Sequence, residues 1–134
     1  MLVFGFINKI GYNMAILSFK DLVVWQKSMC LVTEIYKLTK LLPDEERYAL
    51  SSQMRRAVVS IPSNIAEGQQ RNTSREFVHF LCVARGSIAE LETQLLICVN
   101  LNFFDEKQIE TSMKTCEEIH KMLHSLIDKI SSEQ

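Results

Sequence analysis

Residues 53–71 read QMRRAVVSIPSNIAEGQQR, and this stretch carries two separate faces at helical spacing. One face is a row of polar side chains three or four residues apart, called here the polar stripe: Gln53, Arg56, Ser60, Asn64, Glu67 and Arg71. The other face is an apolar row that predicts contact with a core: Leu50, Met54, Ala57, Ile61 and Ile65. A plain surface helix carries mostly Lys and Glu outside, whereas the polar stripe mixes guanidinium, amide, hydroxyl and carboxylate groups. Such groups can be buried only when they bond to one another or to a partner, so we expect the stripe to form an interface.

Apolar residues recur at helical spacing in four segments, which predict helices over residues 20–41, 44–69, 73–102 and 105–131. In the first segment the expected core face is Leu22, Trp25, Met29, Val32 and Tyr36. Pro43 and the three acids after it mark the start of the second segment, and Thr73 with Glu76 fits a capping box at the start of the third. The connections are only a few residues long, and short connections force neighbouring helices to run antiparallel. The predicted fold class is therefore all-α, an antiparallel up-down-up-down four-helix bundle.

Two local features bear on how these helices pack. Pro62 cannot donate a backbone hydrogen bond to the carbonyl of Val58. We expect a kink there rather than a break, because the polar stripe stays in phase on both sides. Gly86 and Ser87 offer a small-residue surface that another backbone can approach closely, and with the polar stripe they favour assembly into a homo-oligomer.

The composition, 47% hydrophobic and 23% charged over 134 residues, is ordinary for one soluble globular domain. The net charge of −1 gives no overall field that would attract nucleic acid or an anionic membrane. No apolar run reaches the ~18 residues that a membrane helix needs, so no membrane partner is expected. The cysteines form no Cys-x-x-Cys pair and fall on apolar helical faces, which favours reduced core thiols in a cytoplasmic protein: Cys30, Cys82, Cys98 and Cys116.

Residues 1–13 are apolar and fit the helical pattern poorly, since a lysine and a glycine interrupt them. No small-residue cleavage site follows a clean apolar run, so a signal peptide is not favoured. We expect residues 1–17 to form a flexible extension, with Met14 as the natural start of the folded part and residues 18–131 as the bundle domain.

The sequence carries no pattern that predicts catalysis. A Gly-rich phosphate loop, His-Glu-x-x-His and a nucleophile elbow are all absent. Glu-x-x-His occurs at residues 76–79 and 117–120, as in di-iron bundles, but antiparallel helices put the two histidines roughly 13 Å apart along the bundle. A zinc site at Cys116, His120 and His124 would need ligands from another helix. We expect no catalytic residue, no cofactor and no metal.

Four arginines are the candidates for contact with nucleic-acid phosphates: Arg55, Arg71, Arg75 and Arg85. A conventional recognition helix would show a denser basic face than they provide. Arg56 is instead expected to pair with Glu67 or Glu90, within the chain or across an interface. RNA binding, if it occurs, is therefore expected to be weak and to depend on repetition of these arginines around an oligomer.

Three segments carry a resemblance to a known family: FKDLVVWQKS, IYKLTKLLPDEERYALSSQMRRAVVSIPSNIAEGQQR and EFVHFLCVARGSIAELETQL. The chain resembles the bacterial four-helix-bundle family of 23S rRNA intervening-sequence proteins over about residues 18–130. SIPSNIAEG and ARGSIAELE are the most specific marks, and residues 1–13 have no counterpart in the family pattern. The resemblance implies a ring-shaped homopentamer of antiparallel four-helix bundles. A related group, the accessory variability determinant of diversity-generating retroelements, is a basic pentamer that binds reverse transcriptase and nucleic acid. This chain differs from that group in charge, since its net charge is −1.

Two functional hypotheses follow. The first is a non-enzymatic scaffold or interaction module, a homo-oligomer that presents a surface to an unidentified protein partner. The alternative is an RNA-binding or other nucleic-acid-binding accessory protein, linked to rRNA or to a retroelement reverse transcriptase.

Overall fold

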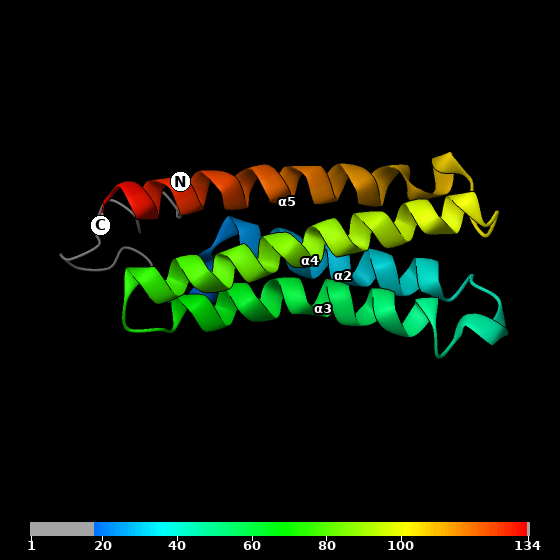
Figure 1. The fold of residues 1–134 in the computed structure, drawn as a ribbon, viewed down its shortest axis with the longest axis horizontal. Helices are drawn as coiled ribbons and strands as arrows, with labels where there is room; N and C mark the ends of the chain where they lie inside the picture. The colour runs from blue at the N-terminus through cyan, green and yellow to red at the C-terminus, as the bar shows by residue number, and fades with distance from the viewer. Residues whose placement is uncertain (1–17, 134) are drawn as a thin grey trace.

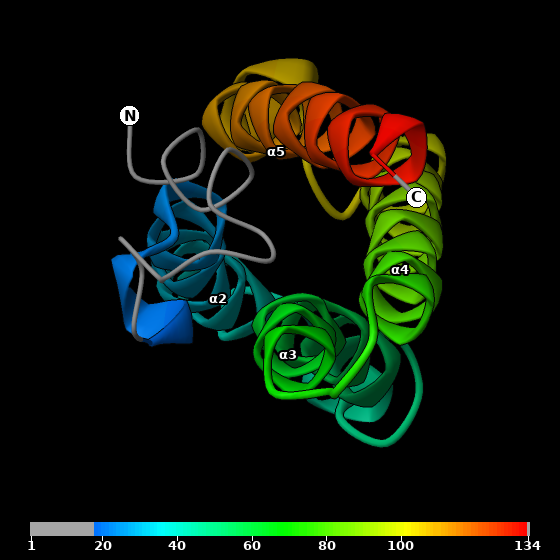
Figure 2. The same cartoon turned by 90° about the vertical axis from the view of Figure 1, so that its left-hand side faces the viewer.

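The computed structural model describes residues 18–133. The elements in chain order are η1 (Phe19–Asp21), α2 (Val23–Thr39), η2 (Asp44–Glu46), α3 (Leu50–Gln69), α4 (Ser74–Asn100) and α5 (Glu106–Ser132). Successive long helices run in opposite directions (Figure 1) and lie around a common centre (Figure 2). The predicted all-α antiparallel four-helix bundle is confirmed. The extension predicted for residues 1–17, with a start at Met14, lies outside the described residues.

All four long helices contribute side chains to one apolar core. Residues with no exposed surface occur on each of them: Leu31, Ile35, Met54, Ile61, Leu81, Ile88, Cys116 and Leu123. Removing this apolar surface from water is the main favourable term in folding. The contact between α3 and α4 is the most extensive in the bundle, and that between α2 and α5 is the least extensive of the four neighbouring pairs. Among the described helices, none combines the length and the apolar character needed to cross a membrane.

The core face predicted for residues 50–65 is confirmed, since Met54, Ala57, Ile61 and Ile65 are buried and Leu50 is half-buried. The face predicted for the first helix is only partly right, since Leu22 is buried and Trp25 and Val32 are half-buried against the core. The buried residues of α2 are Val24, Ser28, Leu31, Ile35 and Thr39, whereas Met29 and Tyr36 are exposed. The two rows lie beside one another on the helix, so packing against the neighbouring helices decides between them. The narrower row turns inward, and the bulkier Trp25 covers its edge against Phe19, with ring centroids 5.3 Å apart.

The start predicted for the second helix is wrong by six residues. Asp44–Glu46 forms only a single 3-10 turn, and α3 begins at Leu50 after Ala49 has left the helical region, with φ −120° and ψ −102°. Pro43 and the acids do favour a helical turn, but residues 47–49 are all exposed and have no core contact to extend it. The result is a bent connection whose side chains stand beside α3.

Two positions on α3 show how closely it meets its neighbours. The helix runs through Pro62 without a break, as predicted, with the ring buried; a kink there stays a prediction. The close approach of backbones occurs at Gly68 rather than at Gly86. A Cβ on Gly68 would lie 2.8 Å from Cβ of Phe80, whereas a Cβ on Gly86 would meet no atom within 4 Å.

The long helices α4 and α5 begin with side-chain caps. Thr73 Oγ1 accepts a hydrogen bond from Glu76 N at 3.1 Å, but the Glu76 carboxylate accepts from the Thr73 hydroxyl instead of returning to the Thr73 backbone. The predicted capping box is therefore only half formed. At the start of α5, Asp105 and Gln108 form both bonds of a capping box, and the Asp-x-x-Gln spacing in the sequence is the signal for it.

Candidate interaction surface

The polar stripe lies along the seam between α3 and α4. At its middle, Ser60 Oγ of α3 and Ser87 Oγ of α4 share a hydrogen bond of 2.7 Å. Asn64 Nδ2 donates to the Ser60 carbonyl at 2.8 Å and to Ser60 Oγ at 3.0 Å. These polar groups are satisfied within the chain, so the middle of the stripe helps to join the two helices.

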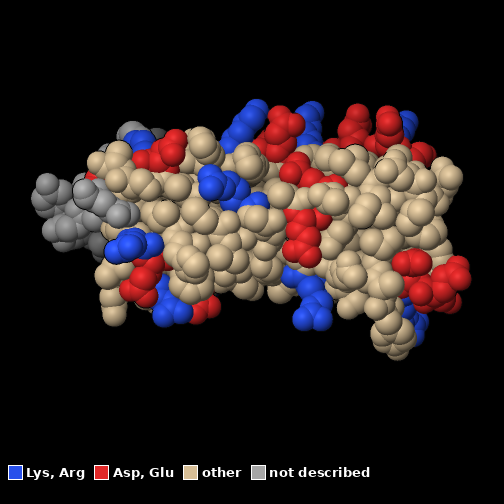
Figure 3. Space-filling model, viewed as in Figure 1, with Lys and Arg blue, Asp and Glu red and all other residues tan. Residues whose placement is uncertain are grey.

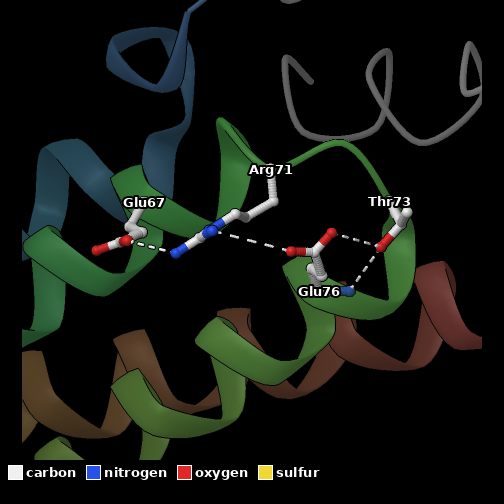
Figure 4. Close-up of polar contacts among 4 residues, drawn as sticks. All are labelled: Glu67, Arg71, Thr73 and Glu76. Carbon is white, nitrogen blue, oxygen red and sulfur yellow. Dashed lines mark hydrogen bonds and ion pairs between the residues drawn. The ribbon is translucent and has the colours of Figure 1, made fainter.

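The C-terminal end of the stripe ties the end of α3 to the start of α4, as Figure 4 shows. Arg71 Nη2 lies 2.7 Å from Glu67 Oε2, and Arg71 Nη1 lies 3.9 Å from Glu76 Oε2. The guanidinium also covers the ring of Phe80, at 4.8 Å from its centroid. Because the Arg71 and Glu67 side chains are 41% and 53% exposed, water screens the pair and its contribution to stability is small.

The N-terminal end of the stripe is different, because its groups point into solvent. Gln53 and Arg56 are exposed. Within residues 18–133, no ion pair joins Arg56 to Glu67 or to Glu90, so the pairing predicted within the chain is wrong. Helical spacing explains this, since Glu67 is three turns away and Arg71 is one turn from it. The pairing of Arg56 across an interface stays a prediction.

One buried polar atom lies beside this end of the stripe. Gln94 of α4 is 5% exposed, and its Nε2 donates to Glu90 Oε2 at 3.4 Å. Gln94 Oε1 has no hydrogen-bond partner among the described residues. Leaving a buried oxygen without a hydrogen-bond partner costs ~1–3 kcal/mol, so Gln94 lowers the stability of this part of the α3–α4 seam.

Apolar side chains stand exposed next to the stripe. Val59 lies on the outside of α3, while Val83 and Ile97 lie on the outside of α4. Gly86 and Glu90 are exposed between them, at spacings of three, four and seven residues that place all four α4 positions on one side of the helix. These positions are called here the outer α3–α4 face: Arg56, Val59, Val83, Gly86, Glu90 and Ile97.

A groove of about 940 Å³ opens where η2 and the bent connection stand beside α3. Arg55 lies in it, with Nε donating to Thr39 Oγ1 at 2.8 Å and the guanidinium 4.6 Å from the ring centroid of Tyr36. The exposed side chains of Arg47 and Tyr48 also line it. Sequence reasoning did not find this groove, because it placed Tyr36 in the core and residues 47–48 inside a regular helix.

The four arginines expected to contact nucleic acid do not come together within one chain. Arg55 lies in the groove, while Arg71 is at the other end of α3, sixteen residues or ~24 Å along the helix. Arg75 is exposed near the start of α4, and Arg85 is half-buried with Nη2 donating to Cys82 Sγ at 3.8 Å. On the face shown in Figure 3, basic side chains stand in separate places among acidic and uncharged ones and form no continuous basic surface.

The thiols are all free among the described residues, and only two of them lie in the core. Burial raises the pKa of Cys116 to about 12 and that of Cys98 to about 11, and nearby carboxylates add to both shifts. Cys82 is half-buried and Cys30 is exposed, so the prediction of a core position is wrong for Cys30, which lies on the solvent side of α2. Residues 18–133 contain no group of three His, Cys, Asp or Glu side chains placed to hold a metal ion.

The match to a family model decides the relationship of this chain to known proteins. The model described as 23S rRNA-intervening sequence protein matches residues 20–125. The chain belongs to this family. A crystal structure from Bacteroides thetaiotaomicron, described as a protein with unknown function from the S23 ribosomal protein family, is 30% identical in sequence. It superposes with a TM-score of 0.73 and covers 78% of this chain and 98% of its own. No curated protein matches this chain. The family match includes all of α2, α3 and α4, so the residues of the polar stripe and of the groove lie within the matched part of the chain.

Proposed function

We propose that this family member is a non-catalytic interaction module whose copies assemble with one another through the outer α3–α4 face. The observation that carries the proposal is the set of apolar side chains left exposed there, Val59, Val83 and Ile97. Single exposed apolar residues are ordinary, but three on two adjacent helices beside an open glycine are typical of an interface core. Burying one such side chain fully is worth ~1.5–3 kcal/mol, and a symmetric assembly repeats that gain in every subunit.

Charge on the same face supports a second copy as the partner. Arg56 has no ion pair within the described chain, and Glu90, exposed on the neighbouring helix, carries the opposite charge. Contact between copies would bring these groups together in a rim around the apolar side chains. The family resemblance implies five copies in a closed ring, and we propose that number for this chain.

Light scattering coupled to size-exclusion chromatography tests the assembly. At micromolar concentration we expect about 78 kDa for five copies of the 15.5 kDa chain. A mass of one chain at that concentration would end the proposal. A closed oligomer with another number of copies would keep the interaction module and reject the pentamer.

A variant at Gly86 tests the surface. Gly86 is exposed and a Cβ there would meet no neighbouring side chain or helix within 4 Å, so the single bundle should still fold with the substitution Gly86→Arg. In an assembly the same side chain would stand between two copies, and we expect the mass to fall to that of a monomer. Ala89→Arg is the matched control, because Ala89 is exposed on the same helix but outside the outer α3–α4 face. An unchanged mass for Gly86→Arg would place the interface elsewhere.

A further inference from the structure

The groove between the bent connection and α3 concentrates positive charge in a protein whose net charge is −1. Four cations line it, and Asp44 is the acid among the lining residues: Lys40, Arg47, Arg55 and Arg56. None of these four cations forms an ion pair with another residue of the described chain. Acidic side chains elsewhere do pair, as Glu67 with Arg71 and Glu118 with Lys27. The groove therefore favours an anion from outside the chain.

Aromatic rings stand beside these cations. Tyr36 supports the Arg55 guanidinium at 4.6 Å, and the Arg55 Nε bond to Thr39 fixes its direction. Tyr48 lines the groove with 88% of its surface exposed, the highest value among the exposed large apolar and aromatic residues of the described chain. A tyrosine ring held in water gains no burial energy in the single bundle, so its position suits a partner with a flat face.

We propose that this groove binds a short single-stranded segment of nucleic acid, with phosphates on Arg47 and Arg55 and a base stacked on Tyr48. A nucleic-acid strand alternates charged phosphates with flat apolar rings, and the groove offers guanidinium groups and exposed aromatic faces side by side. An acidic peptide would use the cations but would leave the ring of Tyr48 without a flat partner. The volume of about 940 Å³ is open along the surface and suits a chain that enters and leaves rather than an enclosed small molecule.

This inference goes beyond the proposed assembly. Arg56 and Val59 line the groove and also belong to the outer α3–α4 face, but the variants that test the two ideas change other residues. Arg47 and Tyr48 belong to the bent connection, while the assembly variant changes Gly86 on α4. A failure of either idea is therefore separable from a failure of the other. If the chain is an oligomer, the groove is repeated in every copy and several weak contacts act together on one strand.

Fluorescence anisotropy with the full-length protein tests the groove. The probe is a labelled oligouridylate of about ten nucleotides, chosen because it forms no duplex and spans a typical binding site. At low salt we expect saturable binding that weakens steeply as salt is added, because phosphate contacts release counterions. A glutamate peptide of the same length is the acidic control, and tighter binding of that peptide would overturn the proposal. The absence of an anisotropy change with the oligouridylate would also overturn it.

Three variants separate charge from stacking. Arg47→Gln should lower the salt dependence by about one phosphate contact, and Tyr48→Ala should weaken binding about tenfold while leaving the salt dependence unchanged. Tyr48→Phe keeps the ring and should bind like the parent. Lys114→Gln removes an exposed charge on α5, away from the groove, and is the matched control. Binding that responds no more to Arg47→Gln or Tyr48→Ala than to Lys114→Gln would place the nucleic acid elsewhere and reject the groove.

Discussion

Gly68 of α3 lies so close to Phe80 of α4 that a Cβ on Gly68 would stand 2.8 Å from Cβ of Phe80. The Phe77 ring and backbone carbonyl are also within 3.2 Å of that position. The approach occurs one turn before Arg71 reaches across to Glu76, so the same end of α3 makes this close backbone approach and an ion pair with α4.

Gly68→Ala should destabilise the fold by ~1–3 kcal/mol, because the added methyl group meets a Cβ and a backbone carbonyl that cannot move away easily. Gly86→Ala is the matched control, since it adds a methyl group at an open helical position and should stabilise by ~0.5–1 kcal/mol. Urea unfolding of both variants measures the difference. Equal changes in unfolding free energy for the two variants would mean that α3 and α4 lie farther apart at Gly68 than the structure shows.

Ser60 and Ser87 should be energetically coupled through their 2.7 Å hydrogen bond. We expect Ser87→Ala to cost ~1 kcal/mol, because Ser87 is buried and the substitution leaves the Ser60 hydroxyl with one partner fewer. A double-mutant cycle with Ser60→Ala isolates the pair and should give a coupling of at least ~0.5 kcal/mol. Additive effects would show that Asn64 alone satisfies Ser60.

Arg56→Ala and Glu67→Ala should each change the stability of a single bundle by no more than ~1 kcal/mol, as should Lys114→Ala, because all three side chains are exposed. The proposed assembly predicts a difference among them. Only the loss at Arg56 should grow with protein concentration, since a group that acts between subunits contributes to Tm by mass action. Melting curves recorded over a hundredfold range of protein concentration provide the measurement. If Tm depends on concentration in the same way for Arg56→Ala and Lys114→Ala, Arg56 does not lie in the interface.

The stability should fall as pH rises above the ordinary thiol pKa of 9.0, because burial raises the pKa of Cys116 to about 12 in the folded state. In the unfolded chain this thiol loses its proton near pH 9, whereas the folded state keeps it, so the unfolded state binds fewer protons between pH 9 and about 12. One such thiol contributes a slope of ~1.4 kcal/mol per pH unit in that window. Cys116→Ala should have a shallower slope than the parent, whatever its stability at neutral pH. Equal slopes from urea unfolding at pH 9 to 10.5 would contradict the burial of this thiol.

Thiol reactivity provides an independent measurement of the same burial. In the folded protein an alkylating reagent at pH 8 should modify Cys30 first, because Cys30 is exposed while Cys98 and Cys116 are buried. Mass spectrometry of digested samples identifies the modified positions. Early modification of Cys116 would show that α5 opens from the bundle without global unfolding.

Much of the fold could be predicted from local spacing. The apolar row from Leu50 to Ile65 identified the core side of α3 correctly, and the short connections identified the antiparallel order. The cap at Thr73 could also be predicted, although the Glu76 carboxylate accepts from the Thr73 hydroxyl and faces Arg71 instead of bonding to the Thr73 backbone. The core side of α2 could not be predicted correctly. Two apolar rows lie side by side on that helix, and packing against the neighbouring helices determines which row is buried.

The sequence by itself determined four amphipathic helices and a polar stripe on α3, because helical period is a property of residues three or four positions apart. The tertiary structure decided what the stripe does: it placed Ser60 against Ser87, twenty-seven residues away, and left Arg56 in solvent. It also formed the groove, by ending the helical turn after Glu46 and setting Tyr48 beside α3. Such contacts join residues from different elements, and their geometry depends on how closely whole helices pack, which no local spacing encodes.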